Sequence, residues 1–468
     1  MSRTLRRRLL FAGLGLLLTA GAALGAYSVF SRREVTTSSS EALQYYRLGR
    51  ENERKMYTKE AVGAYAEALK FDPHFVMATA RLAALTWDRD PERARVLFEC
   101  ARSSAGSISE RERLQLRIFE TGMNAKDSKE LEPLLDEYVR RFPDDPEGYV
   151  QRASLYTRTS RMPQAIADLE KLISLNPNYA SAYNELGYYW LRQGDYAKAE
   201  EYLRRYRFLA PDQANPNDSL GELYYSIGRY EEAEEFLKKA LEVKPDFYAS
   251  RAHLGTLEVA RGRLAEAAEQ FRAAAEGTEL TGQRSEWLWS EALTLAVAGK
   301  AEEATAVVGK IPLPPSDSNP TRQRIIDAQV QLRHGLFAAL LGRTAEAEAV
   351  IAPSTALVAD APKEVKENLE VFLAAVRGFI AAREGRHAEA VEAFRAAIPE
   401  RPETGNVYFP ARDMLRIALS QSLAALGRAG EAEEALKPVL SRNPKFQPAL
   451  DALDRIRSGS LAAARSSS

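Results

Sequence analysis

The sequence is short of the residues that build disulfides and metal centres. It contains one cysteine, Cys100, so an intrachain disulfide and a zinc site of the CxxC…CxxC type are both excluded. None of its four histidines stands in an HExxH or HxH cluster. We therefore expect no metal site and no cofactor. Because Cys100 follows Phe98 on a predicted helix, we expect it to be a buried small side chain.

An excess of charge of one sign is also missing. The chain has 64 Lys+Arg against 65 Asp+Glu, which gives a net charge of -1, so no basic field favours nucleic acid as a partner.

Catalytic signatures are missing as well. The sequence has no GxSxG, HExxH or Walker loop, and no GxGxxG that follows a strand. The acidic pairs in "DRD" (88–90) and "PDDP" (143–146) are better explained as N-caps of helices than as acid–base or metal groups. His253 is better explained as a packed or surface side chain than as a ligand. We predict that the protein is not an enzyme.

A long hydrophobic run stands at the N-terminus. The segment "LLFAGLGLLLTAGAALGAYSVF" (9–30) is uncharged and, at about 1.5 Å per residue, long enough to span a bilayer. It predicts a signal-anchor or transmembrane segment over residues 1–30, followed by a polar linker over residues 31–41. Cleavage as a signal peptide is the alternative, because "TAGAALGA" offers small residues.

The arginines around this run predict its orientation. Four of them precede it and two follow it: Arg3, Arg6, Arg7 and Arg8, then Arg32 and Arg33. We therefore expect the N-terminus in the cytoplasm and the body on the extracytoplasmic or periplasmic side of the cytoplasmic (inner) membrane, or exported as a soluble protein. Gly21 and Gly25 have the GxxxG spacing that allows a homodimer, although small residues are common in such segments.

The rest of the chain repeats itself. "GRYEEAEEFLKKALEVKPDF" begins at Gly228, and the related "GRLAEAAEQF" begins at Gly262, 34 residues later. Three series of residues step by the same interval: Gly187, Gly221 and Gly255; Ala165, Ala199, Ala233 and Ala267; Pro177, Pro211 and Pro245. A fixed period of this size indicates stacked supersecondary units.

Each unit predicts two helices. Apolar residues recur at intervals of three and four in two blocks, and a glycine that can adopt the left-handed conformation separates the blocks. These glycines are Gly194, Gly228, Gly262, Gly299, Gly342, Gly385 and Gly427. In the unit over 214–247, the small residues Gly221 and Ala233 allow close crossing, while Tyr224 and Leu237 fill the space around them. One hairpin cannot bury its apolar face, so the units must stack.

The segments "YNELGYYW" (183–190) and "NDSLGELYY" (217–225), with the alanine and proline series above, resemble the tetratricopeptide repeat. This resemblance implies an all-α, right-handed superhelical solenoid of about ten to eleven helix–turn–helix units. The units are expected to start near residues 42, 75, 112, 146, 180, 214, 248, 285, 328, 371 and 413.

The register suggests the following organisation. A first array covers residues 42–281 and a second covers 285–446, with a proline-rich break at 311–320 as a candidate hinge. We expect a lengthened connection at 352–362, a capping helix at 447–457 and a disordered tail at 458–468.

The resemblance also implies a concave groove that binds extended or helical peptides and is lined by fixed positions of each first helix. The candidate groove residues are Asn184, Tyr188, Arg192, Asp218, Glu222 and Tyr225. Asn184 would pair with a peptide backbone, the two tyrosines would pack against its side chains, and Arg192 would meet an acidic group. Tyr149 and Tyr183 are expected in the core. The Lys and Asn set by which some family members hold a C-terminal carboxylate is absent here, which disfavours a chaperone-tail clamp.

The predicted function is a non-enzymatic scaffold or adaptor of the cell envelope that binds proteins or peptides and assembles or stabilises a membrane or secretion complex. One alternative is a sensory or regulatory ectodomain coupled to a membrane partner. A second is an enzyme with a cryptic site in the second and third units.

Overall fold

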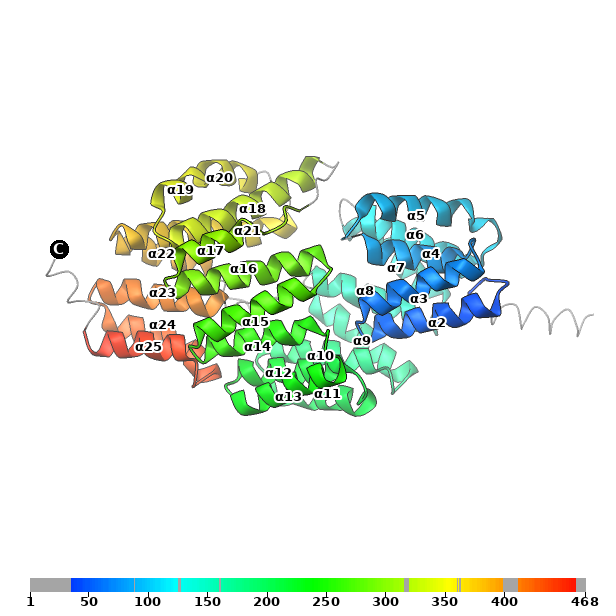
Figure 1. The fold of residues 1–468 in the computed structure, drawn as a ribbon, viewed down its shortest axis with the longest axis horizontal. Helices are drawn as coiled ribbons and strands as arrows, with labels where there is room; N and C mark the ends of the chain where they lie inside the picture. Colours follow the sequence, from blue (N-terminus) through cyan, green and yellow to red (C-terminus); the bar gives the residue numbers. More distant parts are fainter. Residues whose placement is uncertain are drawn as a thin grey trace, which may run out of the picture. The chain divides into compact units, whose positions relative to one another are not determined.

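The structure is a computed structural model that describes residues 35–87, 89–124, 128–159, 161–314, 320–359, 361, 363–398 and 411–459. All regular secondary structure within these ranges is helical, as predicted (Figure 1). The hydrophobic segment 1–30, with Gly21 and Gly25, and most of the expected tail lie outside them. In the part that is described, no helix is both long enough and apolar enough to cross a membrane.

The chain divides into two compact units, Met1–Ala125 and Lys126–Ser468. The helices of the first unit are α2 (Ser40–Arg54), α3 (Thr58–Phe71), α4 (Val76–Thr86), α5 (Pro91–Ser103), the 3₁₀ turn η1 (Ala105–Ser107) and α6 (Glu110–Asn124). The division of the repeats near residues 281–285 stays a prediction, and residues 315–319 of the proline-rich break are not described.

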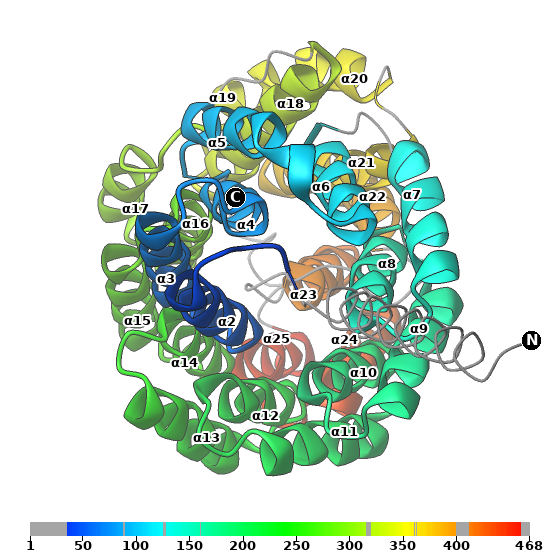
Figure 2. The same ribbon diagram turned by 90° about the vertical axis from the view of Figure 1, so that its right-hand side faces the viewer.

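The second unit continues as a stack of helical hairpins. Its helices are α7 (Ser128–Arg141), α8 (Pro146–Arg158), α9 (Met162–Leu175), α10 (Ala180–Gln193), α11 (Tyr196–Leu209), α12 (Ala214–Ser226), α13 (Tyr230–Val243), α14 (Tyr248–Ala260), α15 (Leu264–Gly277), α16 (Thr281–Val297), α17 (Ala301–Val308), α18 (Pro320–Leu340), α19 (Thr344–Ala349), α20 (Ile351–Ala359), α21 (Lys363–Arg383), α22 (His387–Ala397), α23 (Ala411–Ala425), α24 (Ala429–Arg442) and α25 (Gln447–Arg457). Figure 2 shows α12, α14 and α16 on the inner side of this stack and α13, α15 and α17 on its outer side.

The hairpin turns confirm the role predicted for the glycines. Every glycine named above as a separator of two helices has φ between 74° and 80°, the left-handed region in which a side chain is disfavoured. Inside a hairpin, glycine serves a different purpose. A Cβ atom at Gly221 would lie 2.6 Å from Leu237 Cγ, so α12 and α13 cross too closely for any larger residue. Tyr224 and Leu237 are fully buried around this crossing, as expected.

The acidic pairs in the turns act as helix caps. The Asp90 carboxylate accepts a hydrogen bond from the Arg93 backbone N–H (3.0 Å) at the start of α5, and Asp145 accepts one from the Glu147 N–H (3.0 Å) at the start of α8. Both satisfy a donor that the first turn of a helix leaves unpaired. The cap interpretation of these pairs is confirmed for the two aspartates.

Two of the predictions about the connections and the core of the helices were wrong. Residues 352–362 are not a lengthened connection, because most of them belong to α20, whose apolar residues favour a helix and whose Pro353 stands in the first turn, where proline is tolerated. Cys100 is exposed rather than buried. The buried residues of α5 are Ala94, Phe98 and Ala101, which share one helical face, and Cys100 lies off that face.

The C-terminal hairpin of the second unit returns to its middle. The Tyr230 hydroxyl donates to Asn443 Oδ1 (3.0 Å), and the Asn443 amide donates to the Tyr225 carbonyl (3.0 Å). The contact requires a glycine at position 228, since a Cβ there would lie 2.8 Å from Asn443 Oδ1. The end of α24 is therefore joined to the α12–α13 turn across 213 residues of sequence.

Candidate partner-binding groove

The six candidate groove residues lie on two consecutive inner helices. Asn184, Tyr188 and Arg192 stand at intervals of four on α10, and therefore share one face of that helix. Asp218 and Glu222 occupy the positions of Asn184 and Tyr188 one repeat later, on α12, and Tyr225 follows them. The repeat thus brings equivalent positions of neighbouring hairpins side by side.

Hydrogen bonds join α10 to α12. The Tyr188 hydroxyl donates to Glu222 Oε2 (2.7 Å), and the Ser219 hydroxyl donates to Asn184 Oδ1 (2.9 Å). Burial, together with the carboxylates of Glu222 and Asp218, raises the pKa of Tyr188 well above its usual value, so the phenol keeps its proton and acts as a donor. Asn184 and Tyr188 therefore act first as links between repeats.

Asp218 joins α12 to α14 in the same way. Its Oδ1 atom accepts from the Ser250 hydroxyl (2.7 Å) and from His253 Nδ1 (2.9 Å), and His253 Nε2 lies 3.7 Å from Glu222 Oε2. The Asp218 and His253 side chains are only 4% and 7% exposed.

The charge of His253 follows from these neighbours. Burial lowers the pKa of this imidazole, but the carboxylates of Asp218 and Glu222 outweigh that effect and raise the pKa to about 9. His253 is therefore a buried imidazolium at neutral pH, with Nδ1–H donating to Asp218. A buried charge of this kind is stable only while its partner is present.

We call the connected side chains of α10, α12 and α14 the inter-repeat network: Asn184, Tyr188, Asp218, Ser219, Glu222, Ser250 and His253. Its serines and its histidine were not among the sequence-predicted groove residues. The 34-residue period could have identified two of them, because Ser219 and His253 stand at equivalent positions of consecutive repeats. The pairing of Asp218 with His253 depends on side-chain geometry, which the period alone does not give.

Arg192 differs from the other groove residues. It is half-buried, and among the residues that the structure describes it makes no hydrogen bond and no ion pair. Desolvation lowers its pKa, and only the more distant charges of Glu185 and Glu222 and the Tyr188 phenol oppose this effect. Tyr225 flanks the network, with its ring centroid 6.0 Å from that of His253. The groove thus combines the hydrogen-bonded inter-repeat network with the Arg192 guanidinium, which contacts no carboxylate in the described part of the chain.

The two tyrosines expected in the core differ in how deeply they are buried. Tyr149 is buried, as predicted. Tyr183 is only half-buried and lines a pocket on the outer side of α10, so this expectation was wrong for Tyr183.

The repeats match models of a known family. Three stretches, residues 150–214, 219–247 and 414–438, match tetratricopeptide-repeat models. Together with the stacked helical hairpins, these matches show that the chain contains tetratricopeptide repeats in these stretches.

Similar proteins were found among curated sequences and solved structures. The chain is 35% identical over 65 residues to Hsp70-Hsp90 organizing protein 2 of Arabidopsis thaliana and 36% identical over 66 residues to Hsp70-Hsp90 organizing protein of Triticum aestivum. Each match covers 14% of this chain and 11% of the relative, so the similarity spans about a tenth of either relative. The crystal structure of the APC/C hetero-tetramer Cut9-Hcn1 shares 15% identity over 94% of this chain and 81% of that chain, with a TM-score of 0.47.

Proposed function

We propose that this protein is a non-enzymatic scaffold that holds a partner protein or peptide against the inner faces of α10 and α12, with Arg192 binding an acidic group of the partner. The observation that carries the proposal is the half-buried Arg192 guanidinium, which contacts no carboxylate in the described part of the chain. Charged hydrogen bonds formed in such a partly desolvated place are stronger than those on an open surface.

The flanking residues support the same role. Tyr225 offers an aromatic ring beside the network, and aromatic and arginine side chains commonly dominate the energy of protein interfaces. The inter-repeat network below them fixes the spacing of α10, α12 and α14, so the surface is preorganised and a partner loses less free energy in ordering it.

We place this scaffold at the cell envelope because of the sequence of its first thirty residues. An uncharged run over 9–30, preceded by four arginines, favours insertion with the repeats outside the cytoplasm. In that place the scaffold would assemble or stabilise a membrane or secretion complex. The named relatives organise Hsp70 and Hsp90, but the absence of a Lys and Asn carboxylate clamp at the groove positions disfavours a chaperone tail as the partner here.

The test is a crosslinked pull-down from native membranes with wild-type protein and the Arg192→Gln variant. Alanine at Asn184 or Tyr188 would remove links between repeats, whereas Arg192→Gln removes only the charge. Arg263→Gln, which alters an exposed arginine in the α14–α15 turn, is the matched control. We expect a small set of envelope proteins that wild type and Arg263→Gln both recover and Arg192→Gln loses. Recovery of the same set by all three proteins would contradict a role for this groove.

The membrane position has its own test. Carbonate extraction of native membranes should leave the full-length chain in the membrane pellet. A shorter chain in the soluble fraction would instead indicate cleavage of the N-terminal segment and export of the repeats.

A further inference from the structure

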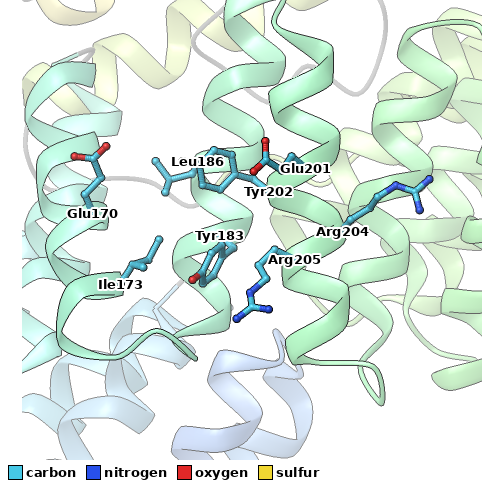
Figure 3. Close-up of a pocket in the computed structure, with 8 residues that line it drawn as sticks. All are labelled: Glu170, Ile173, Tyr183, Leu186, Glu201, Tyr202, Arg204 and Arg205. Atoms are coloured by element: carbon cyan, nitrogen blue, oxygen red, sulfur yellow. The ribbon is translucent and has the colours of Figure 1, made fainter.

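A pocket opens on the outer side of α10, between α9 and α11. Its volume is about 660 Å³, and Figure 3 shows the residues that line it. Its lining residues are Glu170, Ile173, Tyr183, Leu186, Glu201, Tyr202, Arg204 and Arg205. Its apolar floor comes from Ile173, Leu186 and the rings of Tyr183 and Tyr202, whose centroids lie 6.3 Å apart. None of these residues belongs to the partner-binding groove, so the pocket is a separate site.

The same space one repeat later is filled by an arginine of the protein itself. The residues 34 positions later in the sequence are Arg207, which corresponds to Ile173, and Phe236, which corresponds to Tyr202. The Arg207 guanidinium lies 5.1 Å from the centroid of the Phe236 ring, and its Nε donates to Asn217 Oδ1 (2.9 Å). The space between α11 and α13 is thus occupied by a stacked guanidinium, whereas the shorter Ile173 leaves the space between α9 and α11 open.

The preceding repeat also uses an arginine. In that repeat, 34 positions earlier, Arg152 corresponds to Leu186. Asp136 corresponds to Glu170, and Asp168 corresponds to Tyr202. Arg152 bridges these two aspartates, with contacts of 2.8 Å to Asp136 and 2.7 Å to Asp168. Guanidinium groups from different positions of the repeat therefore occupy the equivalent space in the hairpins before and after the pocket, one paired with carboxylates and one stacked on a ring.

The pocket itself offers carboxylates for pairing and the Tyr202 ring for stacking. Within the described residues, the carboxylates of Glu170 and Glu201 make no hydrogen bond and no ion pair. In Figure 3 both lie toward the upper side of the pocket, and the Arg205 guanidinium points to the lower side. The Tyr202 ring stands where Phe236 holds Arg207.

The two arginines of the rim do not prevent a further cation from entering. Arg204 is paired with Glu200 and donates to the Tyr224 hydroxyl (3.0 Å), and Arg205 lies over the Tyr183 and Phe208 rings. In the next repeat the equivalent residues are also cationic, namely Lys238 and Lys239. Lys239 lies 5.1 Å from the Phe236 ring that holds Arg207. The next repeat thus already contains a guanidinium beside cationic side chains.

We propose that this pocket receives an arginine side chain of a partner protein. The guanidinium stacks on Tyr202 and pairs with Glu170 and Glu201, while the aliphatic part of the side chain packs on Ile173. Arginine fits better than lysine, because its planar group can stack and form a forked contact with carboxylates at the same time. The pocket would be a second contact point, on the outer face, for a partner that reaches around α10 or for a second partner.

The experiment measures binding of a fluorescein-labelled peptide, Gly-Leu-Arg-Leu-Gly, to the full chain by fluorescence polarisation. Matched peptides carry lysine or citrulline in place of arginine. We expect the citrulline peptide to bind at least about tenfold more weakly, because it lacks the charge. We expect the lysine peptide to fall in between, because it cannot form the forked contact.

Two variants test the position of the binding site. Ile173→Arg supplies the arginine that the next repeat carries, so it should fill the pocket and abolish binding. Glu170→Gln keeps the shape of the pocket and should weaken binding of the arginine peptide about threefold or more. Glu170→Gln still tests the position of the site if circular dichroism shows that Ile173→Arg has lost helicity.

Arg192→Gln separates this proposal from the proposed groove, and it should leave peptide binding unchanged. Equal binding of the arginine and citrulline peptides would overturn the proposal. The proposal would also be overturned if Glu170→Gln and a folded Ile173→Arg both bound the arginine peptide as tightly as wild type. Loss of binding in Arg192→Gln, with binding retained by the other two variants, would overturn it as well.

Discussion

Polar residues on the inner faces of α12 and α10 serve different purposes. On α12, Asp218 faces Ser250 and His253 of the following repeat, so its charge is matched inside the protein. On α10, Arg192 finds no acidic side chain in contact within the described residues. A polar residue on an inner helix either links repeats or faces a partner, depending on which side chains the following repeat places beside it.

The largest effect should follow from breaking the matched charge. Asp218→Ala leaves the buried His253 imidazolium without its main partner and removes the acceptor of Ser250. The cost of breaking such a buried pair is about 3–5 kcal/mol of unfolding free energy, seen as a clear drop in the thermal midpoint. Asp212→Ala, at an exposed position between α11 and α12, is the control and should leave the midpoint nearly unchanged. Equal midpoints for the two variants would show that the network does not stabilise the repeats.

The next effect concerns pH. Because folding raises the pKa of His253 from 6.5 to about 9, its stabilising contribution is complete below pH 6.5 and is lost as the pH rises through 9. The difference in unfolding free energy between wild type and His253→Gln should therefore shrink by about 3 kcal/mol between pH 6 and pH 10. Denaturant unfolding of both proteins at several pH values measures it. A difference for His253→Gln that stays constant across the pH range would mean that this imidazole is neutral in the folded protein.

The smallest effect tests the link between α10 and α12. Tyr188→Phe removes the hydroxyl that donates to Glu222 and should cost about 1 kcal/mol of unfolding free energy. Tyr189→Phe is the matched control, since within the described part of the chain the Tyr189 hydroxyl makes no hydrogen bond. If both variants unfold at the same midpoint, the Tyr188–Glu222 bond adds nothing to the stability of the groove.

The helices and their turns were predictable because each depends on local chemistry. Gly228 must be a glycine whether or not its surroundings are known, and the apolar spacing of α12 and α13 predicts their shared face. Helix α20 was missed because two prolines and a change of register suggested a loop, although its apolar residues favour a helix. Cys100 was misplaced because a neighbouring Phe98 does not determine the face on which the next residues lie.

The candidate site was predictable only as a set of positions. The 34-residue repeat identifies the positions of Asn184, Tyr188, Asp218 and Glu222, and in the structure these residues lie close together. Whether each of them contacts another repeat depends on side-chain length and direction, as the pairing of Asp218 with His253 shows. The pocket beside Ile173 could not be predicted either, because a space that neighbouring hairpins fill with arginine side chains becomes visible only when the helices on both sides are placed.

The contact of Asn443 with Tyr230 and Tyr225 bears on how the second unit folds. A linear repeat array has only contacts between neighbours, so its ends fray first and unfolding can spread inward from them. Here a hydrogen bond that spans 213 residues closes a long loop, and its entropic cost must be met before the contact forms. We expect this contact to form late in folding. Once it is made, the backbone amides of α24 should exchange with solvent as slowly as those of the interior helices rather than at the rate of a free end.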